Sequence, residues 1–198
     1  MLVLDVGCGI GGPGAWIRAN AGCMVVGVDV MEDAARGARL LFPESRIAVA
    51  SSRSLPFAEH TFDAAIALGV LETIADKRSA LREIGRVLAT GARLCVYTYL
   101  WAEEEVPEAP VADRFQTCTA FEEEIDAVGL ERIDARVFNG FGTTPGSWRE
   151  AARVAHREVE RLHGSDPLFI EAVAEMNKIA RLISQRAVQP WLYVLRGP

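Results

Sequence analysis

The feature that most limits how this chain can fold is an apolar run that ends in a cluster of glycines. Residues 3–12 read VLDVGCGIGG, and the glycines at 7, 9 and 12 fit the spacing G-x-G-x-x-G. A buried strand that enters a glycine turn and continues into a helix is the usual site for a nucleotide-like ligand in an α/β sheet. The glycine spacing alone is a weak indication of which ligand binds.

Asp5, two residues before the first glycine, helps to discriminate between ligands. A pyrophosphate favours a turn of backbone N–H groups without a carboxylate nearby, because like charges repel in a poorly solvated crevice. A ligand with a cationic amino-acid end favours that carboxylate. S-adenosylmethionine carries an ammonium and a sulfonium, so the turn suits it better than NAD.

Further motifs follow along residues 1 to about 100, and their order and spacing indicate a family more specifically than any single motif does. They are VVGVD at 25–29, SLPFAEHTFD at 54–63, VLETI at 70–74, and a helix and strand over 76–99. With LDVGCG in front, the chain resembles the class I S-adenosylmethionine-dependent methyltransferases of the small-molecule, type 11-like kind. The resemblance implies S-adenosyl-L-methionine as cofactor, S-adenosyl-L-homocysteine as product and methyl transfer to a small molecule.

Strands and helices alternate, which favours a parallel sheet covered on both faces. We expect an α/β, Rossmann-like, doubly wound sheet of seven mostly parallel strands, with strand 7 antiparallel and a helical insertion between strands 6 and 7. The predicted strands are 2–6, 24–29, 46–51, 63–69, 92–99, 130–138 and 191–196. The first predicted helices are 13–21, 32–41, 76–89 ending at Gly91, and one that opens with the capping box Thr119-x-x-Glu122.

The length of 198 residues favours a single domain. We divide it into a cofactor-binding core (1–138), an inserted helical cap (139–189) and the last strand (190–198). The cap consists of a Gly/Thr-rich linker (139–146), a helix with the capping box Ser147-x-x-Glu150, and a helix starting at Asp166-Pro167. A cap over the substrate and a helical pair that only packs on the sheet, or forms a homodimer, are equally good interpretations.

Composition excludes several classes of function. The net charge of −6 argues against a nucleic-acid partner, and no apolar run is long enough for a membrane span. The four cysteines and three histidines show no metal-ligand spacing, so no metal is expected. Reduced thiols and a start without a signal peptide favour a cytoplasmic protein. The family usually has one or two helices before the first strand, and this sequence begins on that strand.

The resemblance also implies which residues bind the cofactor. Asp5 would meet the methionine ammonium, Asp29 would accept from both ribose hydroxyls, and Val30 would pack on the adenine. An alternative for Asp29 is a helix N-cap. Ser51 stands where the family often has an acidic residue. At the end of strand 4, Leu68 or Gly69 would present a carbonyl to the methionine end. The proposed set is Asp5, Gly7, Cys8, Gly9, Gly11, Asp29, Val30, Ser51, Ser52, Arg53 and Leu68.

Catalytic residues are harder to recognise, because methyl transfer needs mainly orientation of the reactants. Glu72, where the fourth strand leaves the sheet, is the candidate general base, although a cap or a solvated side chain is the more common role. Thr73 replaces the histidine frequent in the family. Tyr97 and Tyr99 share one sheet face and suit the core or the substrate equally.

Two other functions remain open. An NAD-dependent oxidoreductase would share the glycines and Asp29, but it should also show a catalytic Tyr/Lys or His arrangement, which we do not find. A non-catalytic S-adenosylmethionine-binding module is compatible with Ser51 and Thr73 in place of the usual family residues.

Overall fold

The computed structural model describes residues 1–104, 114–138, 140 and 146–197. These residues form a seven-stranded sheet in the order β3-β2-β1-β4-β5-β7-β6. Strand β7 runs antiparallel to both of its neighbours, and the other pairs in the order β3-β2-β1-β4-β5 are parallel. The predicted doubly wound sheet with an antiparallel last strand is therefore confirmed.

The strands agree closely with the prediction at the amino-terminal end and less closely later. Their bounds are β1 Leu2–Val6, β2 Met24–Asp29, β3 Arg46–Val49, β4 Phe62–Leu68, β5 Leu88–Trp101, β6 Glu131–Val137 and β7 Val188–Arg196. Strand β1 lies between β2 and β4, with Asp5 opposite Gly27 on one side and Ile66 on the other. The carboxyl ends of β1, β2 and β4 therefore meet at one edge of the sheet.

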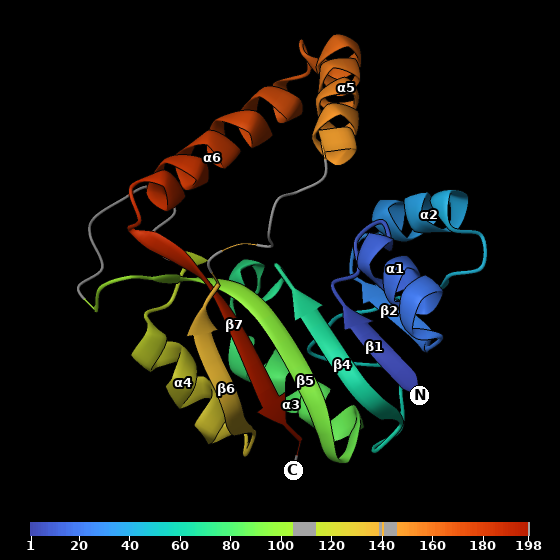
Figure 1. Ribbon diagram of the computed structural model, residues 1–198, viewed down its shortest axis with the longest axis vertical. Helices are drawn as coiled ribbons and strands as arrows, with labels where there is room; N and C mark the ends of the chain where they lie inside the picture. The colour runs from blue at the N-terminus through green and yellow to red at the C-terminus, as the bar shows by residue number, and fades with distance from the viewer. Residues whose placement is uncertain (105–113, 139, 141–145, 198) are drawn as a thin grey trace.

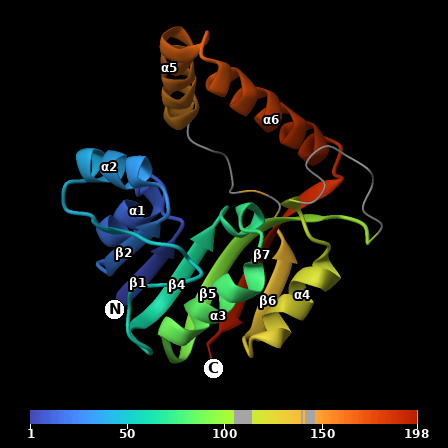
Figure 2. The same ribbon diagram turned by 180° about the vertical axis from the view of Figure 1, so that it is seen from behind.

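Helices cover the two faces unequally. They are α1 Gly12–Ala21, α2 Glu32–Leu41, α3 Lys77–Val87, α4 Cys118–Ala127, α5 Gly146–His163 and α6 Pro167–Ser184, with a 3₁₀ turn η1 at Leu71–Thr73. Helices α3 and α4 lie over the face that is nearer the viewer in Figure 2. Helix α1 packs on the opposite face, where Gly14 lies against Asp5 and Val25.

The main core fills the layer between the sheet and helices α3 and α4. Alternate residues of β5, among them Leu94 and Val96, point into it and are fully buried. They meet Leu81 and Ile84 from the apolar side of α3 and Phe121 from α4. This layer fixes β4 and β5, whose carboxyl ends carry part of the candidate site.

Three of the predicted element boundaries are wrong. Gly91 does not end α3; the helix stops at Val87, and Gly91 lies within β5 at φ +73°. Thr117, rather than Thr119, is the N-cap of α4, and its hydroxyl accepts from Ala120 N at 3.2 Å. Ser147 does not cap α5, because the helix already begins at Gly146.

The insertion between β6 and β7 is present as a pair of long helices. Asp166 caps α6 as predicted, with its carboxylate accepting from Leu168 N at 2.9 Å. Both views show α5 beyond the carboxyl ends of β1 and β4 (Figures 1 and 2). Every described side chain of α5 is exposed, whereas Ile179 and Leu182 of α6 pack on the sheet. Residues 139 and 141–145 of the predicted linker lie outside the described residues.

The cap of α4 gives a direct test of its boundary. Thr117→Ala should lower the free energy of unfolding by about 1 kcal/mol, because a helix N–H then loses its acceptor. Thr119→Ala is the matched control, since Thr119 lies inside the helix and its hydroxyl donates to exposed Glu104. Urea unfolding measures both. A larger loss for Thr119→Ala would contradict the assignment.

Candidate active site

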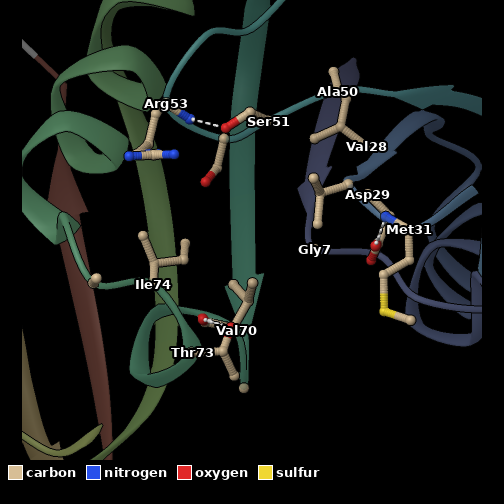
Figure 3. Close-up of a pocket in the computed structure, with 14 residues that line it drawn as sticks. Gly7, Val28, Asp29, Met31, Ala50, Ser51, Arg53, Val70, Thr73 and Ile74 are labelled. Carbon is tan, nitrogen blue, oxygen red and sulfur yellow. Dashed lines mark hydrogen bonds between the residues drawn. The ribbon is translucent and has the colours of Figure 1, made fainter. Parts of the chain in front are cut away.

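A cavity of about 430 Å³ opens at the carboxyl ends of β1, β2 and β4. Figure 3 shows Asp29 and Met31 on one side of it and Val70, Thr73 and Ile74 on the other. Its volume lies within the range of roughly 300–1,000 Å³ typical of small-molecule sites. The lining residues are Gly7, Val28, Asp29, Val30, Met31, Ala50, Ser51, Ser52, Arg53, Gly69, Val70, Thr73, Ile74 and Ala75.

The floor of the cavity is the glycine turn after β1. Gly7 N and Cys8 N both donate to Val28 O, at 2.8 and 3.0 Å. Gly7 has φ +67°, and a Cβ at this position would lie 2.3 Å from Val70 Cγ2. Glycine is therefore required here by both backbone conformation and space, and its absent side chain lets the two strand ends approach.

Asp29 joins the loop after β2 to the glycine turn. Its Oδ2 accepts from Gly9 N at 2.8 Å, and its Oδ1 accepts from Met31 N at 2.9 Å. It is not the N-cap of α2, because that position belongs to Met31, so the alternative role predicted for Asp29 is wrong. Each carboxylate oxygen can accept a second hydrogen bond. Asp29 is thus fixed in orientation at the cavity wall and still has acceptor capacity.

A charged pair on α3 holds the loop that forms another wall. Leu55 N donates to Glu83 Oε2 at 3.0 Å, and Arg86 donates to Leu55 O and Phe57 O at 3.2 and 3.0 Å. The Arg86 guanidinium also donates to Glu83 and lowers the pKa of that carboxyl. Sequence reasoning missed this pair; its only trace is the spacing Glu83-x-x-Arg86 on one side of a helix.

Asp5 does not line this cavity. Its side chain is 2% exposed and lies under α1, with Oδ2 lacking a hydrogen-bond partner in the described part of the chain. Burial, with a smaller contribution from the negative charge of Asp29, raises the pKa of Asp5 to about 7. Asp5 therefore titrates near neutral pH.

Cys8 is also a packing residue in this structure. Its sulfur lies over Gly27, where a Cβ would come within 2.7 Å of Cys8 Sγ. Burial and the nearby carboxylates of Asp5 and Asp29 raise the pKa of the Cys8 thiol to about 12. The thiol is therefore protonated and unreactive near neutral pH.

Glu72 lies behind the cavity wall rather than in it. Its Oε2 accepts from the Thr98 hydroxyl at 3.1 Å. Burial raises the pKa of Glu72, although the positive charges of Lys77 and Arg114 act in the opposite direction. Leu68 likewise does not line the cavity, whereas the next residue, Gly69, does.

Comparison with known proteins identifies the amino-terminal half. Residues 4–96 match the family described as the methyltransferase domain. The segment carries the glycine turn, Asp29 and the strand end at Gly69 that build the cavity. These residues form a methyltransferase domain of class I.

Curated relatives match about half of the chain. The methyltransferase GfsG from Streptomyces halstedii is 36% identical over an alignment of 100 residues that covers 48% of this chain and 36% of that protein. The O-methyltransferase resE from Aspergillus sclerotiorum is 35% identical over 48% of this chain and 38% of its own length. A probable tRNA methyltransferase 9B from Mus musculus is 34% identical over 52% of this chain and 22% of that protein. The chain thus spans less than two fifths of the length of these relatives.

Solved structures match the whole chain in fold. The [4+2]-cyclase SpnF has a TM-score of 0.78 at 22% identity and covers all of this chain, which spans 74% of that one. A geranyl diphosphate C-methyltransferase from Streptomyces coelicolor has a TM-score of 0.71 at 16% identity, with 100% of this chain and 72% of that one covered. At these identities the likeness establishes the methyltransferase fold, insertion included.

The methyltransferase domain brings together about half of the residues that we predicted from sequence. Those lining the cavity are Gly7, Asp29, Val30, Ser51, Ser52 and Arg53. Gly9 does not line the cavity but donates its N–H to the Asp29 carboxylate. The other predicted residues lie outside the lining; they are Asp5, Cys8, Gly11, Leu68 and Glu72. The lining residues that we missed are Val28, Met31, Ala50, Val70, Thr73, Ile74 and Ala75. The position of Val70 to Ala75 directly after a strand end was the signal that could have found them.

The close approach at Gly7 can be tested against Gly9, whose φ is also positive at +51° but whose Cβ would meet no atom within 4 Å. Gly9→Ala should cost about 1–2 kcal/mol of stability from backbone strain alone. Gly7→Ala should cost about 1–3 kcal/mol more, because Val70 must also move. Denaturant unfolding checks the difference, and equal losses would contradict the contact.

The raised pKa of Asp5 predicts a pH-dependent stability. In the unfolded chain this carboxyl ionises near its ordinary pKa of 3.8, whereas in the folded domain it ionises near pH 7. Stability from this group is therefore present below about pH 4 and declines as the pH rises towards 7. The stability advantage of Asp5→Asn over the wild type should grow by about 2–3 kcal/mol between pH 5 and pH 8. Parallel unfolding profiles for the two proteins over this range would contradict the prediction.

Proposed function

We propose that this chain binds S-adenosyl-L-methionine in the 430 Å³ cavity and transfers its methyl group to a small molecule. The observation that supports the proposal most is Asp29, a carboxylate held by two backbone N–H groups at the wall of a cavity floored by a glycine turn. The family match of residues 4–96 and the methyltransferase names of the curated relatives support the same activity.

The cavity residues fit this cofactor. The remaining acceptor capacity of Asp29 suits the two ribose hydroxyls. Val30 and Met31 are 71% and 62% exposed beside it, and they offer apolar surface for the adenine. The backbone at Gly7 and Gly69 would lie along the methionine end. Asp5 stays a proposed partner of the methionine ammonium, and a cation near it would favour its ionised form.

When bound, the cofactor supplies a sulfonium methyl, whose S–C bond breaks as the acceptor–carbon bond forms and whose electron pair stays on sulfur. The contribution of the protein is to hold the reactants in line, which can supply about 7–11 kcal/mol of the barrier. An acceptor hydroxyl or amine also loses a proton. Glu72 is proposed as the base, because the next residue, Thr73, lines the cavity and burial raises the pKa of the Glu72 carboxyl.

We propose a small-molecule acceptor rather than a nucleic acid. The net charge of −6 leaves no basic surplus to neutralise phosphates. Helices α5 and α6, beyond the carboxyl ends of the strands, are proposed to cap the acceptor. A cytoplasmic location and a possible homodimer are parts of the same proposal. None of the described helices is long and apolar enough to cross a membrane.

A second candidate is a cofactor-binding module without methyl transfer. The observation that favours it is the position of Glu72, which lies outside the cavity lining and is bonded to Thr98. It predicts tight S-adenosylhomocysteine binding without product from any acceptor. The [4+2]-cyclase with this fold illustrates that the fold alone does not determine the reaction.

Calorimetric titration with S-adenosylhomocysteine tests the proposal, with NAD as parallel ligand. Asp29→Asn should weaken binding about 10–100-fold, because hydrogen bonds to a charged acceptor contribute about 1.5–3 kcal/mol each. The matched control is Asp33→Asn, which makes the same charge change at an exposed position in the first turn of α2.

The 2′-deoxy analogue of S-adenosylhomocysteine separates ribose contact from misfolding. The analogue should bind the wild type more weakly than S-adenosylhomocysteine does. Asp29→Asn should then weaken binding of the analogue by a smaller factor than it weakens binding of S-adenosylhomocysteine. Binding of NAD in preference to S-adenosylhomocysteine would overturn the proposal. Equal binding by Asp29→Asn and Asp33→Asn would remove Asp29 from the site.

A further inference from the structure

Three aromatic rings form a cluster beside the cavity that the cofactor does not account for. Tyr97 and Tyr99 lie on one face of β5, with ring centroids 5.5 Å apart at 80°, and the Tyr97 hydroxyl donates to the Tyr99 oxygen at 3.0 Å. Phe138, just after β6, meets Tyr97 edge to face at 5.7 Å. We refer to Tyr97, Tyr99 and Phe138 as the aromatic cluster.

The backbone of Tyr97 lies next to the cavity wall at Gly69. Gly69, which lines the cavity, donates its N–H to Tyr97 O at 2.8 Å. Tyr97 also pairs in register with Leu68 on β4. Neighbouring strands lie about 4.8 Å apart. A molecule resting on Tyr97 would therefore lie next to whatever occupies the β4 side of the cavity.

The insertion forms the other boundary of the aromatic cluster. Tyr99 packs against Trp101, Phe115 and Val188 together with Ile179 and Leu182 of α6. The carboxyl-terminal half of α6 is thus fixed next to the tyrosines. An ion pair of 2.9 Å between Arg114 and Glu175 also holds this helix.

Packing in the main core does not explain these tyrosines. The main core lies on the other face of β5, where Leu94, Val96 and Thr98 are buried. Tyr97 and Tyr99 are only partly buried. Burial and the hydrogen bond to Tyr99 raise the pKa of Tyr97 above its ordinary value, so its hydroxyl stays protonated. No oxygen in the described part of the chain accepts from the Tyr99 hydroxyl, which leaves that O–H available.

We propose that the aromatic cluster binds the methyl acceptor, and that the acceptor is a planar, mainly apolar molecule whose oxygen accepts a hydrogen bond from Tyr99. The inference rests on the proposed function, because it places the acceptor next to the cofactor cavity. Edge-to-face contacts with Tyr97 and Phe138 would select a flat ring. The Tyr99 hydroxyl would fix the position of the oxygen, so that orientation rather than a strong base drives the reaction.

Binding of three probes to the protein saturated with S-adenosylhomocysteine tests the inference. The probes are 2-naphthol, naphthalene without the oxygen, and 2-decalol without the planar ring. We expect 2-naphthol to bind tightest by calorimetry. Tyr99→Phe should weaken 2-naphthol about 2–10-fold, the range for one neutral hydrogen bond, and leave naphthalene unchanged.

Tyr193→Phe is the matched control. Tyr193 loses the same single hydroxyl, but its side chain is buried in the main core and its oxygen contacts Cys118 at 3.3 Å. Equal 2-naphthol affinities for Tyr99→Phe and Tyr193→Phe would overturn the inference, as would 2-decalol binding as well as 2-naphthol or no binding of 2-naphthol. Absence of S-adenosylhomocysteine binding in the wild type would instead overturn the proposed function, and the probes then test the aromatic cluster on the ligand-free protein.

Discussion

The end of β2 organises the site, because three consecutive backbone N–H groups of the glycine turn donate to it. Gly7 and Cys8 donate to Val28 O, and Gly9 donates to the Asp29 carboxylate. These bonds pull the turn after β1 against the neighbouring strand and orient Asp29 at the same time. A side chain at position 7 would break the arrangement, since it would collide with Val70 from the end of β4. The shape of the cavity therefore depends on two acceptors at the end of β2, Val28 O and the Asp29 carboxylate, and on the absence of a Cβ at Gly7.

The opposite wall depends on residues that never face the cavity. The loop that carries Ser51 to Arg53 has no regular structure beyond an isolated bridge between Ser51 and Ser54. It is held at Leu55 and Phe57 by the Glu83–Arg86 pair of α3. Since α3 is fixed in turn by the main core, the packing of Leu81 and Ile84 positions a loop on the far side of the strand ends. Positioning residues of this kind carry no sequence motif.

Elements are predictable from the sequence to the extent that local forces determine them. Strands β1 and β2 were predicted to the residue, because an apolar run and a following glycine or acidic residue define each end. Gly91 misled the prediction of α3, since a glycine with positive φ serves a strand irregularity as well as a helix end. The choice between Thr117 and Thr119 as cap depends on where the chain turns, which the capping-box pattern does not determine.

Asp5 shows the same limit within the site. Its position before the turn placed it near the cofactor, but strand alternation directs its side chain to the face covered by α1. There Gly14 allows a close approach, with the position of a Cβ only 3.1 Å from Asp5 Oδ2. A strand residue just before the correct loop can thus lie one layer away from the cavity, and the register of β1 with β2 and β4 reveals it.

The proposed cofactor site and the proposed acceptor site differ in how far the family match covers them. The family match ends at residue 96, one residue before Tyr97. All the residues that line the proposed cofactor cavity lie within the matched segment, whereas the aromatic cluster and α6 lie beyond it. Within the described residues, α6 packs on the sheet through Ile179 and Leu182, whereas the side chains of α5 are exposed. In the acceptor site that we propose, acceptor preference would therefore depend on the aromatic cluster beside α6 rather than on α5.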